Sequence, residues 1–306
     1  MKIYTLTLNP AYDLHAAAGE LQVGKENFAC VTSCDAGGKG VNISRALLNG
    51  GVENTAIVII GDENGGEFKK QLQSEGVNCV FLEKSGRIRE NLTVHAADGK
   101  ETRISFSGFS VTEQIFDELR ERMSIESGDI VAFSGSIPNG VSVESVKRFL
   151  LALKEKGVLL ALDCRSLSIA DIIELQPWLV KPNEEEFSKY YGEQVNGFDD
   201  CVAQATELSL SGVENVMVSL GEKGALLAAD GLYIATPPKV KAVSTIGAGD
   251  SAIAGFISAF VKDVGSANCL KTAVAYGTAA CLTAGTKPPE LSDIEEICKG
   301  VQVRSY

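Results

Sequence analysis

Short apolar runs alternate with amphipathic stretches along nearly the whole chain of 306 residues. The apolar runs predict strands, and the stretches between them predict helices because their apolar residues recur every three or four positions. Strand, helix and strand in this order imply a parallel sheet with helices on both faces. Strands are expected at 3–8, 55–60, 130–133, 158–162, 179–180 and 216–220. The clearest helices are expected at 41–49, 113–123, 142–156 and 201–211.

Two segments interrupt this rhythm, residues 13–34 and 90–106, and neither contains a good helix. The second has two alternating runs around Asp98-Gly99, which is a hairpin signal. Together the two segments predict a small separate sheet that is inserted into the main domain.

Composition excludes several classes of protein. The formal net charge of -12 argues against general nucleic-acid binding and against docking on an anionic membrane surface. No apolar stretch approaches the roughly 20 residues of a membrane helix, and the N-terminus lacks the pattern of a signal peptide. The eight cysteines are scattered and only two histidines are present, which predicts reduced thiols in a cytoplasm and no zinc site.

Polar or glycine-rich segments follow four of the predicted strands. Ligands bind beyond the carboxyl ends of the strands in open parallel sheets, so these segments outline a site. Connections of this kind are often polar for structural reasons alone, and only the four together carry weight. They are residues 134–140, 163–166, 181–186 and 221–224.

The most informative segment is 244–257, where two glycines precede a helix that starts near 248–250. Gly247 and Gly249 leave the backbone amides unobstructed, and a glycine turn that leads into a helix N-terminus attracts anions. The segment does not match GxxxxGK[ST], and no protein-kinase HRD or DFG set occurs. Spacing alone therefore predicts an anion site at a helix terminus.

Asp250 lies in the first turn of this helix. One interpretation is a helix-start carboxylate that contributes about 0.3–1 kcal/mol. The other is a general base, because a carboxylate beside a phosphate site is useful as the acceptor of a hydroxyl proton. Both interpretations are open on spacing alone, and the family resemblance described below favours the general base.

A second glycine turn, residues 35–42, also leads into a helix and contains Lys39, which could serve a phosphate or a hydroxyl. Asp13 follows the first strand near the same edge and suits two sugar hydroxyls. A solvated loop lysine and a turn aspartate are the structural alternatives.

Three arginines flank the small sheet and could clamp a phosphate: Arg87, Arg89 and Arg103, of which Arg89 is the best candidate. His15 and His95 lie on the alternating segments, where the sequence indicates no partner for either and we expect structural roles.

These residues together resemble the pfkB family of ribokinase-like carbohydrate kinases. The two anchors are Gly-Gly-Lys-Gly at 37–40 and Thr-Ile-Gly-Ala-Gly-Asp-Ser at 245–251. Residues 9–13, 37–45, 134–140 and 181–183 also resemble the subgroup of 1-phosphofructokinases and tagatose-6-phosphate kinases. The resemblance covers essentially the whole chain.

The resemblance implies a three-layer αβα core with a mostly parallel sheet, plus a small β-sheet lid. The core would comprise residues 1–10, 36–88 and 108–306, and the lid residues 11–35 and 89–107. Lids of this kind are often used for dimer contacts, which implies a homodimer as one assembly. The resemblance also implies ATP and Mg²⁺ as cofactors.

Roles for individual residues follow from the same resemblance. Asp250 would be the general base, with the amides of Gly247, Ala248 and Gly249 as the anion hole. The sugar would be held by Asp13, Gly38, Lys39 and Asn42, and its phosphate by Arg89 and Arg103. The nucleotide would be bound by Lys181, Asn183, Glu186, Ser219, Gly221, Gly224 and Thr245, with Glu186 acting on magnesium through water.

The expected reaction is ATP-dependent phosphorylation of a ketohexose monophosphate, tagatose 6-phosphate or fructose 1-phosphate, to the bisphosphate. One departure concerns Arg165, where the subgroup tends to carry a small residue. Two alternatives stay open: a kinase for an unphosphorylated sugar or nucleoside, and a non-catalytic sugar-phosphate sensor.

Overall fold

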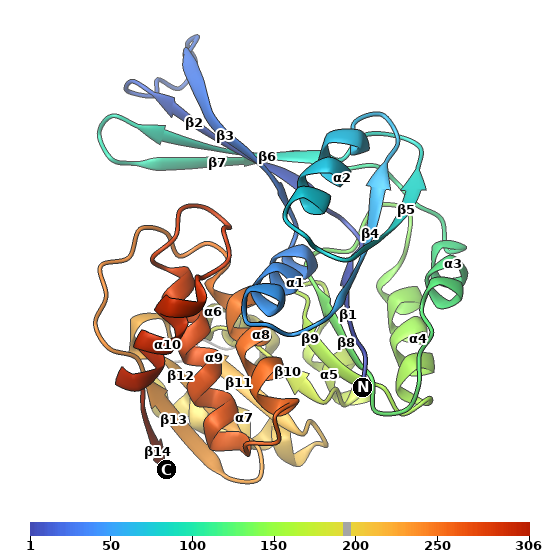
Figure 1. Cartoon of the computed structure of the whole chain (residues 1–306), viewed down its shortest axis with the longest axis vertical. Coiled ribbons are helices and arrows are strands. Elements are labelled where there is room, and N and C mark those ends of the chain that lie inside the picture. The colour runs from blue at the N-terminus through green and yellow to red at the C-terminus, as the bar shows by residue number, and fades with distance from the viewer. Residues whose placement is uncertain (192–196) are drawn as a thin grey trace.

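A computed structural model describes residues 1–191 and 197–306, which form two sheets of unequal size (Figure 1). Among these residues the central sheet has ten strands in the order β14-β13-β12-β11-β10-β9-β8-β1-β4-β5. Neighbouring strands run parallel from β5 to β11, and β11 to β14 form an antiparallel edge. The strands are β1 Ile3–Thr7, β4 Thr55–Gly61, β5 Cys79–Lys84, β8 Ile130–Ser134, β9 Leu159–Asp163, β10 Leu179–Val180, β11 Asn215–Ser219, β12 Ala225–Ala228, β13 Leu232–Thr236 and β14 Gln302–Ser305.

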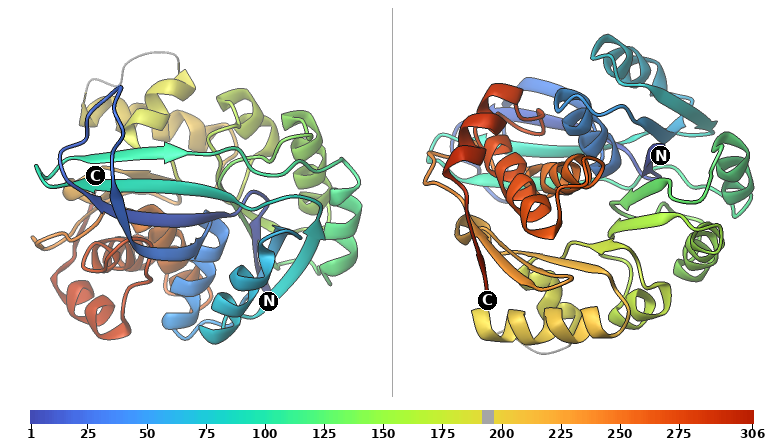
Figure 2. Two further views of the ribbon diagram at one scale, coloured as in Figure 1. Left: turned by 90° about the horizontal axis from the view of Figure 1, so that it is seen from above. Right: turned by 60° about the horizontal axis from the view of Figure 1, so that its bottom comes forward.

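Helices cover both faces of the central sheet, which confirms the predicted fold class (Figure 2). Alternate strand residues divide between two cores: Ile130 and Ala132 pack with α1, α8, α9 and α10, whereas Val131 and Phe133 pack with α3, α4, α5 and α7. The helices are α1 Lys39–Asn49, α2 Gly65–Ser74, α3 Ile115–Arg122, α4 Val143–Lys154, α5 Ile169–Leu175, α6 Glu184–Tyr191, α7 Phe198–Leu210, α8 Ala248–Phe260, α9 Ser266–Ala280 and α10 Leu291–Gly300, with a 3₁₀ turn at Gly221–Lys223.

The small sheet has the order β3-β2-β6-β7, and it lies at the top of Figure 1 and toward the viewer in the left view of Figure 2. Its strands are β2 Ala11–Ala18, β3 Ala29–Gly37, β6 Arg89–Ala96 and β7 Glu101–Ser105. β6 and β7 pair antiparallel around Asp98 and Gly99, as the hairpin signal predicted. The residue bounds given above for core and lid stay a prediction.

The two histidines are partners, and the expectation that neither has one is wrong. His15 Nδ1 lies 2.9 Å from His95 Nε2, and the rings stack with centroids 5.2 Å apart. His95 Nδ1 also lies 3.1 Å from an oxygen of Glu101. The parallel pairing of β2 with β6 places His15 opposite Thr93, so His95 is its diagonal neighbour. This register depends on how the two strands pair in the folded sheet, and it could not be predicted from the two sequence segments separately.

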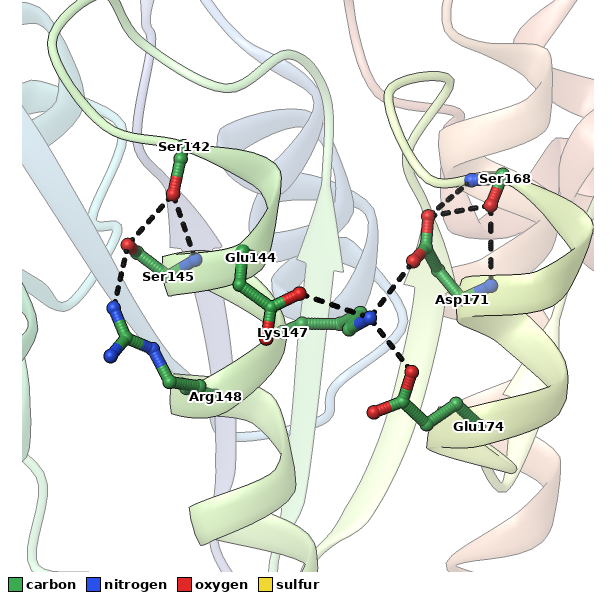
Figure 3. Close-up of polar contacts among 8 residues, drawn as sticks. All are labelled: Ser142, Glu144, Ser145, Lys147, Arg148, Ser168, Asp171 and Glu174. Carbon is green, nitrogen blue, oxygen red and sulfur yellow. Dashed lines mark hydrogen bonds and ion pairs between the residues drawn. The ribbon is translucent and has the colours of Figure 1, made fainter.

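Helices α4 and α5 are joined by one lysine (Figure 3). Lys147 Nζ contacts carboxylate oxygens of Glu144, Asp171 and Glu174 at 3.1, 3.2 and 2.7 Å. Asp171 also completes a capping box with Ser168 at the start of α5. The cap fixes the chain immediately after the carboxyl end of β9, where the site described below is built.

Two predictions from composition can be compared with the fold. All eight cysteines lie in the described residues, and each is a free thiol. None of the described helices combines the length and apolarity that crossing a membrane requires.

Helices α8 and α9 pack at a glycine, and we predict that a methyl group there destabilises the fold. A Cβ at Gly255 would lie 2.7 Å from the Thr272 carbonyl oxygen and 2.8 Å from Cγ of Tyr276. Gly255→Ala should therefore lower the free energy of unfolding in urea by about 1–3 kcal/mol. The matched control is Gly66→Ala in α2, where a Cβ meets nothing within 4 Å. That change should be neutral or stabilise by up to about 1 kcal/mol through helix propensity. Equal stability of the two variants would contradict the close approach.

Candidate active site

A cavity of about 680 Å³ lies between the carboxyl ends of β1, β8, β9 and β10, the start of α8 and the small sheet. Thirteen of the residues proposed from sequence line it: Asp13, Gly38, Lys39, Asn42, Arg89, Arg103, Lys181, Asn183, Glu186, Thr245, Gly247, Gly249 and Asp250. The other four, Ala248, Ser219, Gly221 and Gly224, do not line it. Segments far apart in the sequence thus meet at the sheet edge where parallel sheets bind ligands.

Asp250 stands in the first turn of α8, whose N-cap Gly247 has the left-handed φ of 80° that glycine adopts readily. The carboxylate is only 5% exposed and lines the cavity. Its Oδ2 accepts a hydrogen bond of 2.9 Å from the side-chain amide of Asn42. No ion pair to Asp250 occurs in the described part of the chain, so the carboxylate is not sealed by a cation.

The first turn of α8 also presents backbone amides to the cavity. Gly247 and Gly249 line the cavity, and the unpaired N–H groups of a helix start favour an anion there. The N–H of Ala248 donates to the Thr245 carbonyl at 3.4 Å. A Cβ at Gly249 would lie 2.9 Å from Lys181 Nζ, so glycine permits a close approach of the lysine to the helix start.

Asp163, at the end of β9, is a site residue that sequence analysis did not single out. Its Oδ2 lies 2.9 Å from Lys39 Nζ and 3.5 Å from Lys181 Nζ, and the residue is 5% exposed. Burial opposes ionisation, yet Lys181 and Lys39 hold the pKa of Asp163 below its ordinary value. For Lys39, burial alone would lower the pKa, but the nearby carboxylates of Asp163 and Asp250 raise it above its ordinary value.

Asp250 has the opposite electrostatic character. Burial raises its pKa to about 6, the nearby Asp163 adds to the rise, and Lys39 and the Asn42 amide oppose it. Two carboxylates whose environments move their pKa values apart commonly have different roles in a site. Asp163 is fixed as an anion between lysines, and Asp250 is poised to exchange a proton near neutral pH.

The small sheet supplies the other wall. Asp13 on β2 accepts a hydrogen bond of 2.9 Å from Asn91 on β6, and burial raises its pKa. Arg89 and Arg103 line the same wall, and Arg89 NH2 reaches the Asn9 carbonyl at 3.5 Å. Asn91 was missed from the sequence, although it follows Arg89 by two positions and therefore shares its face of the strand.

Several buried polar atoms around the cavity have no hydrogen-bond partner among the described residues. They are Thr7 Oγ1, Asn9 Oδ1, Asn42 Oδ1, Asn91 Oδ1 and Arg89 Nε. Such atoms are rare in folded proteins and usually bind water or a ligand. Because all five belong to residues that line the cavity, they indicate a ligand rich in hydroxyl or other polar groups.

Comparison with known proteins identifies the family. The model of the pfkB family of carbohydrate kinases matches residues 12–293. The chain belongs to this family. It is 31% identical to a 1-phosphofructokinase of Haemophilus influenzae, with 98% of this chain and 97% of the relative covered. It is 33% identical to a 1-phosphofructokinase of Escherichia coli K12, with 91% and 90% covered.

Solved structures agree with this assignment. Escherichia coli phosphofructokinase-2 in complex with fructose-6-phosphate is similar with a TM-score of 0.90 and 30% identity, covering 97% of this chain and 98% of that one. The same enzyme in complex with substrates and products gives 0.91 and 31%, covering 98% and 99%. This pfkB protein therefore has the ribokinase-like fold and is an ATP-dependent sugar kinase.

Two of the predicted nucleotide residues of this pfkB protein, Asn183 and Glu186, line the cavity at the start of α6. Asn183 Oδ1 accepts from the Glu186 N–H at 2.8 Å, and Glu186 Oε2 accepts from the Asn183 N–H at 3.0 Å. This reciprocal pair is a capping box at the start of α6. Ser219, at the end of β11, forms an isolated bridge with Asn183, so the residues outside the cavity lining continue the same edge.

Glu186 also bears on the predicted magnesium. Its Oε1 accepts a hydrogen bond of 2.5 Å from Arg165, so both carboxylate oxygens are engaged. Direct ligation would break one of these bonds, but an oxygen lone pair can still accept from a metal-bound water. Mg²⁺ retains several waters in protein sites, and this carboxylate fits that mode of binding.

The raised pKa of Asp250 predicts how stability depends on pH. Because the folded-state pKa lies above the ordinary value, stability is lost as pH rises from about 4 through about 6. Asp250→Asn should therefore raise the free energy of unfolding in urea at pH 8, by up to about 3 kcal/mol. The gain should shrink toward zero at pH 4.

Asp163→Asn is the control variant, and its free energy of unfolding should change in the opposite direction. The pKa of Asp163 is lowered, and its loss would leave two lysines unpaired, so this variant should be less stable than the parent protein at pH 8. If Asp250→Asn also lost stability at pH 8, burial would not be what raises the pKa of Asp250.

Proposed function

We propose that the protein transfers the γ-phosphoryl group of ATP to a hydroxyl of a ketohexose monophosphate and releases the bisphosphate. Fructose 1-phosphate and tagatose 6-phosphate are the proposed acceptors. The observation that carries the proposal is the position of Asp250. This buried carboxylate lies on the cavity at the start of α8, without an ion pair in the described residues, where acceptor and nucleotide residues meet.

Asp250 would accept the proton of the attacking hydroxyl. A pKa of about 6 keeps most of the carboxylate ionised at neutral pH while leaving it basic enough to take a proton. Asn42 fixes one oxygen of the carboxylate through its amide hydrogen bond, which orients the other toward the acceptor. The bond formed joins the acceptor oxygen to phosphorus, the bond broken joins phosphorus to the β,γ-bridging oxygen, and ADP leaves.

The start of α8 would stabilise the transferring group. Phosphoryl transfer depends mainly on alignment and charge neutralisation. The amides of Gly247 and Gly249 and the ammonium of Lys39 line the cavity beside Asp250, and they would face the charge on the equatorial oxygens. Magnesium, held by Glu186 through water, would supply further neutralisation of the ATP phosphates.

A phosphorylated acceptor is supported by the small sheet. Arg89 and Arg103 offer guanidinium groups on the wall that also carries Asp13 and Asn91. Carboxylate and amide groups suit sugar hydroxyls, and guanidinium groups suit a phosphate. The curated relatives named 1-phosphofructokinase and the neighbour that holds fructose-6-phosphate support the same class of acceptor.

We also propose that two copies associate through the small sheet. Large apolar side chains on or beside its strands are exposed: Phe28, Val31, Ile104 and Phe106. Exposed apolar residues of this size favour a protein interface. One solved structure of Escherichia coli phosphofructokinase-2 is described as tetrameric and inhibited, which supports self-association as a property of the fold.

ADP release with a panel of acceptors tests the reaction. Fructose 1-phosphate, tagatose 6-phosphate and fructose 6-phosphate should be compared with the unphosphorylated sugars and with nucleosides. Turnover should be fastest with a ketohexose monophosphate. Asp250→Asn should lower kcat by about 10²–10⁴-fold, the usual contribution of a general base, while ATP still binds.

The outcomes separate the competing functions. No turnover with any sugar phosphate would refute the proposal, and ligand binding without ADP formation would favour a sensor. A near-normal kcat for Asp250→Asn would remove Asp250 from the role of base.

Arg89 is the test of phosphate recognition. Arg89→Ala should raise the KM for the sugar phosphate about 10- to 100-fold, as expected when a charge-assisted hydrogen bond is lost, and should leave the KM for ATP nearly unchanged. Arg87→Ala is the matched control, since Arg87 is two residues away, exposed, and paired at 4.0 Å with Glu63 outside the cavity. If Arg89→Ala and Lys39→Ala both left the sugar KM unchanged, an unphosphorylated acceptor would be favoured.

A further inference from the structure

Arg165 is a cavity-lining cation to which neither the family resemblance nor the reaction proposed above assigns a role. It lies two residues beyond the end of β9, in the segment that the Ser168 capping box fixes at its other end. Its side chain is 70% exposed and lines the same cavity as Asp250. Long exposed side chains are normally surrounded by water, whereas Arg165 makes a specific contact with a neighbouring side chain.

That contact is a hydrogen bond from Arg165 Nε to Glu186 Oε1, at 2.5 Å. Among the described residues, Glu186 is the only hydrogen-bond partner of Arg165. Within the described part of the chain, the two terminal nitrogens, with their four N–H donors, therefore have no partner. A guanidinium group that is anchored through Nε and open at both terminal nitrogens presents the forked geometry that binds phosphate.

The position of Glu186 indicates that the phosphate bound by Arg165 belongs to the nucleotide and not to the sugar. Glu186 is fixed by the capping box at the start of α6, at the end of the cavity that carries the nucleotide candidates. The arginines proposed for the sugar phosphate, Arg89 and Arg103, stand on the small sheet at the opposite wall. Arg165 therefore belongs to the nucleotide end.

We propose that Arg165 binds the polyphosphate of the nucleotide and that Glu186 holds it in place for that purpose. This inference rests on the proposed function and adds a residue to it. In the free protein the two side chains form a neutral pair, so Glu186 does not repel an incoming polyanion. With Nε held by Glu186, the terminal N–H groups of Arg165 would donate to the phosphate oxygens.

Calorimetric titration with ATP, without sugar, tests the proposal. With EDTA present to remove metal, Arg165→Ser should bind ATP about 10- to 100-fold more weakly than the parent protein. Arg165→Lys should recover part of the affinity, because it keeps the charge but not the fork. The KM for the sugar phosphate should be unchanged in both variants.

Arg148→Ser is the matched control. Arg148 lies on α4, where Figure 3 shows it beside Ser145, and it does not line the cavity. Its side chain is 63% exposed and pairs with Glu113 at 3.3 Å. This variant should bind ATP as the parent protein does. The anchor is tested by Glu186→Gln, which can keep the helix cap but weakens the hold on Arg165. Removal of the Glu186 charge should favour metal-free ATP, and the gain in affinity should be larger when Arg165→Ser is also present, because Glu186→Gln in the parent background also loses the anchored guanidinium.

Unchanged ATP affinity in Arg165→Ser would overturn the proposal, and so would a rise in the sugar-phosphate KM in place of weaker ATP binding. An equal gain from Glu186→Gln with and without Arg165 would overturn the role of Glu186 as the anchor. A parent protein that binds ATP but turns over no sugar phosphate would refute the proposed acceptor alone, since the binding comparison does not depend on it.

Discussion

The buried carboxylate of Asp163 organises the centre of this protein. Its Oδ2 forms ion pairs with the ammonium groups of Lys39, at the start of α1, and Lys181, immediately after β10. Three separate segments are thereby tied at one edge of the central sheet. Both lysines are paired with Asp163, and among the described residues the Asn42 amide is the only side chain that hydrogen-bonds Asp250. Burial raises the pKa of Asp250, and the neighbouring carboxylate of Asp163 adds to the rise.

Helix packing fixes the positions of the side chains around Asp250. Asn42 on α1 reaches Asp250 on α8 across 2.9 Å, so the starts of two helices meet at the same carboxylate. Both helices bury their apolar faces in the core on one side of the sheet, and α8 approaches α9 through Gly255. Side chains held on packed helices lose little further entropy when a substrate binds, which favours a reaction that depends on alignment.

The sequence predicted the local features of the fold well. Every strand and helix expected at the outset occurs within a few residues of its place, and α8 begins at Ala248 inside the range expected from the glycines and the apolar periodicity. The antiparallel edge formed by β12, β13 and β14 was not anticipated, because periodicity reports on a segment and not on its neighbour in the sheet.

The site residues divide in the same way, into those that local sequence patterns predicted and those that they did not. Residues next to glycine turns, such as Lys39 and Asp250, could be proposed from local patterns, and the cavity includes them. Asp163, Asn91 and the pair of histidines could not, since their importance comes from residues more than 70 positions away in the sequence. Partners across parallel strands depend on register, and register is set by the packed sheet.

The two walls of the cavity are carried by different sheets. Asp13, Asn91, Arg89 and Arg103 belong to the small sheet, whereas Asp250 belongs to a helix of the central layer. Only Leu8, Asn9 and Pro10 separate the end of β1 from the start of β2. Any tilt of the small sheet about this short connection would move the groups proposed to bind the acceptor relative to the proposed base. Under the proposed function, affinity for the sugar and the reach of its hydroxyl would both depend on the angle between the two sheets, and a change that stiffens the connection would alter both together.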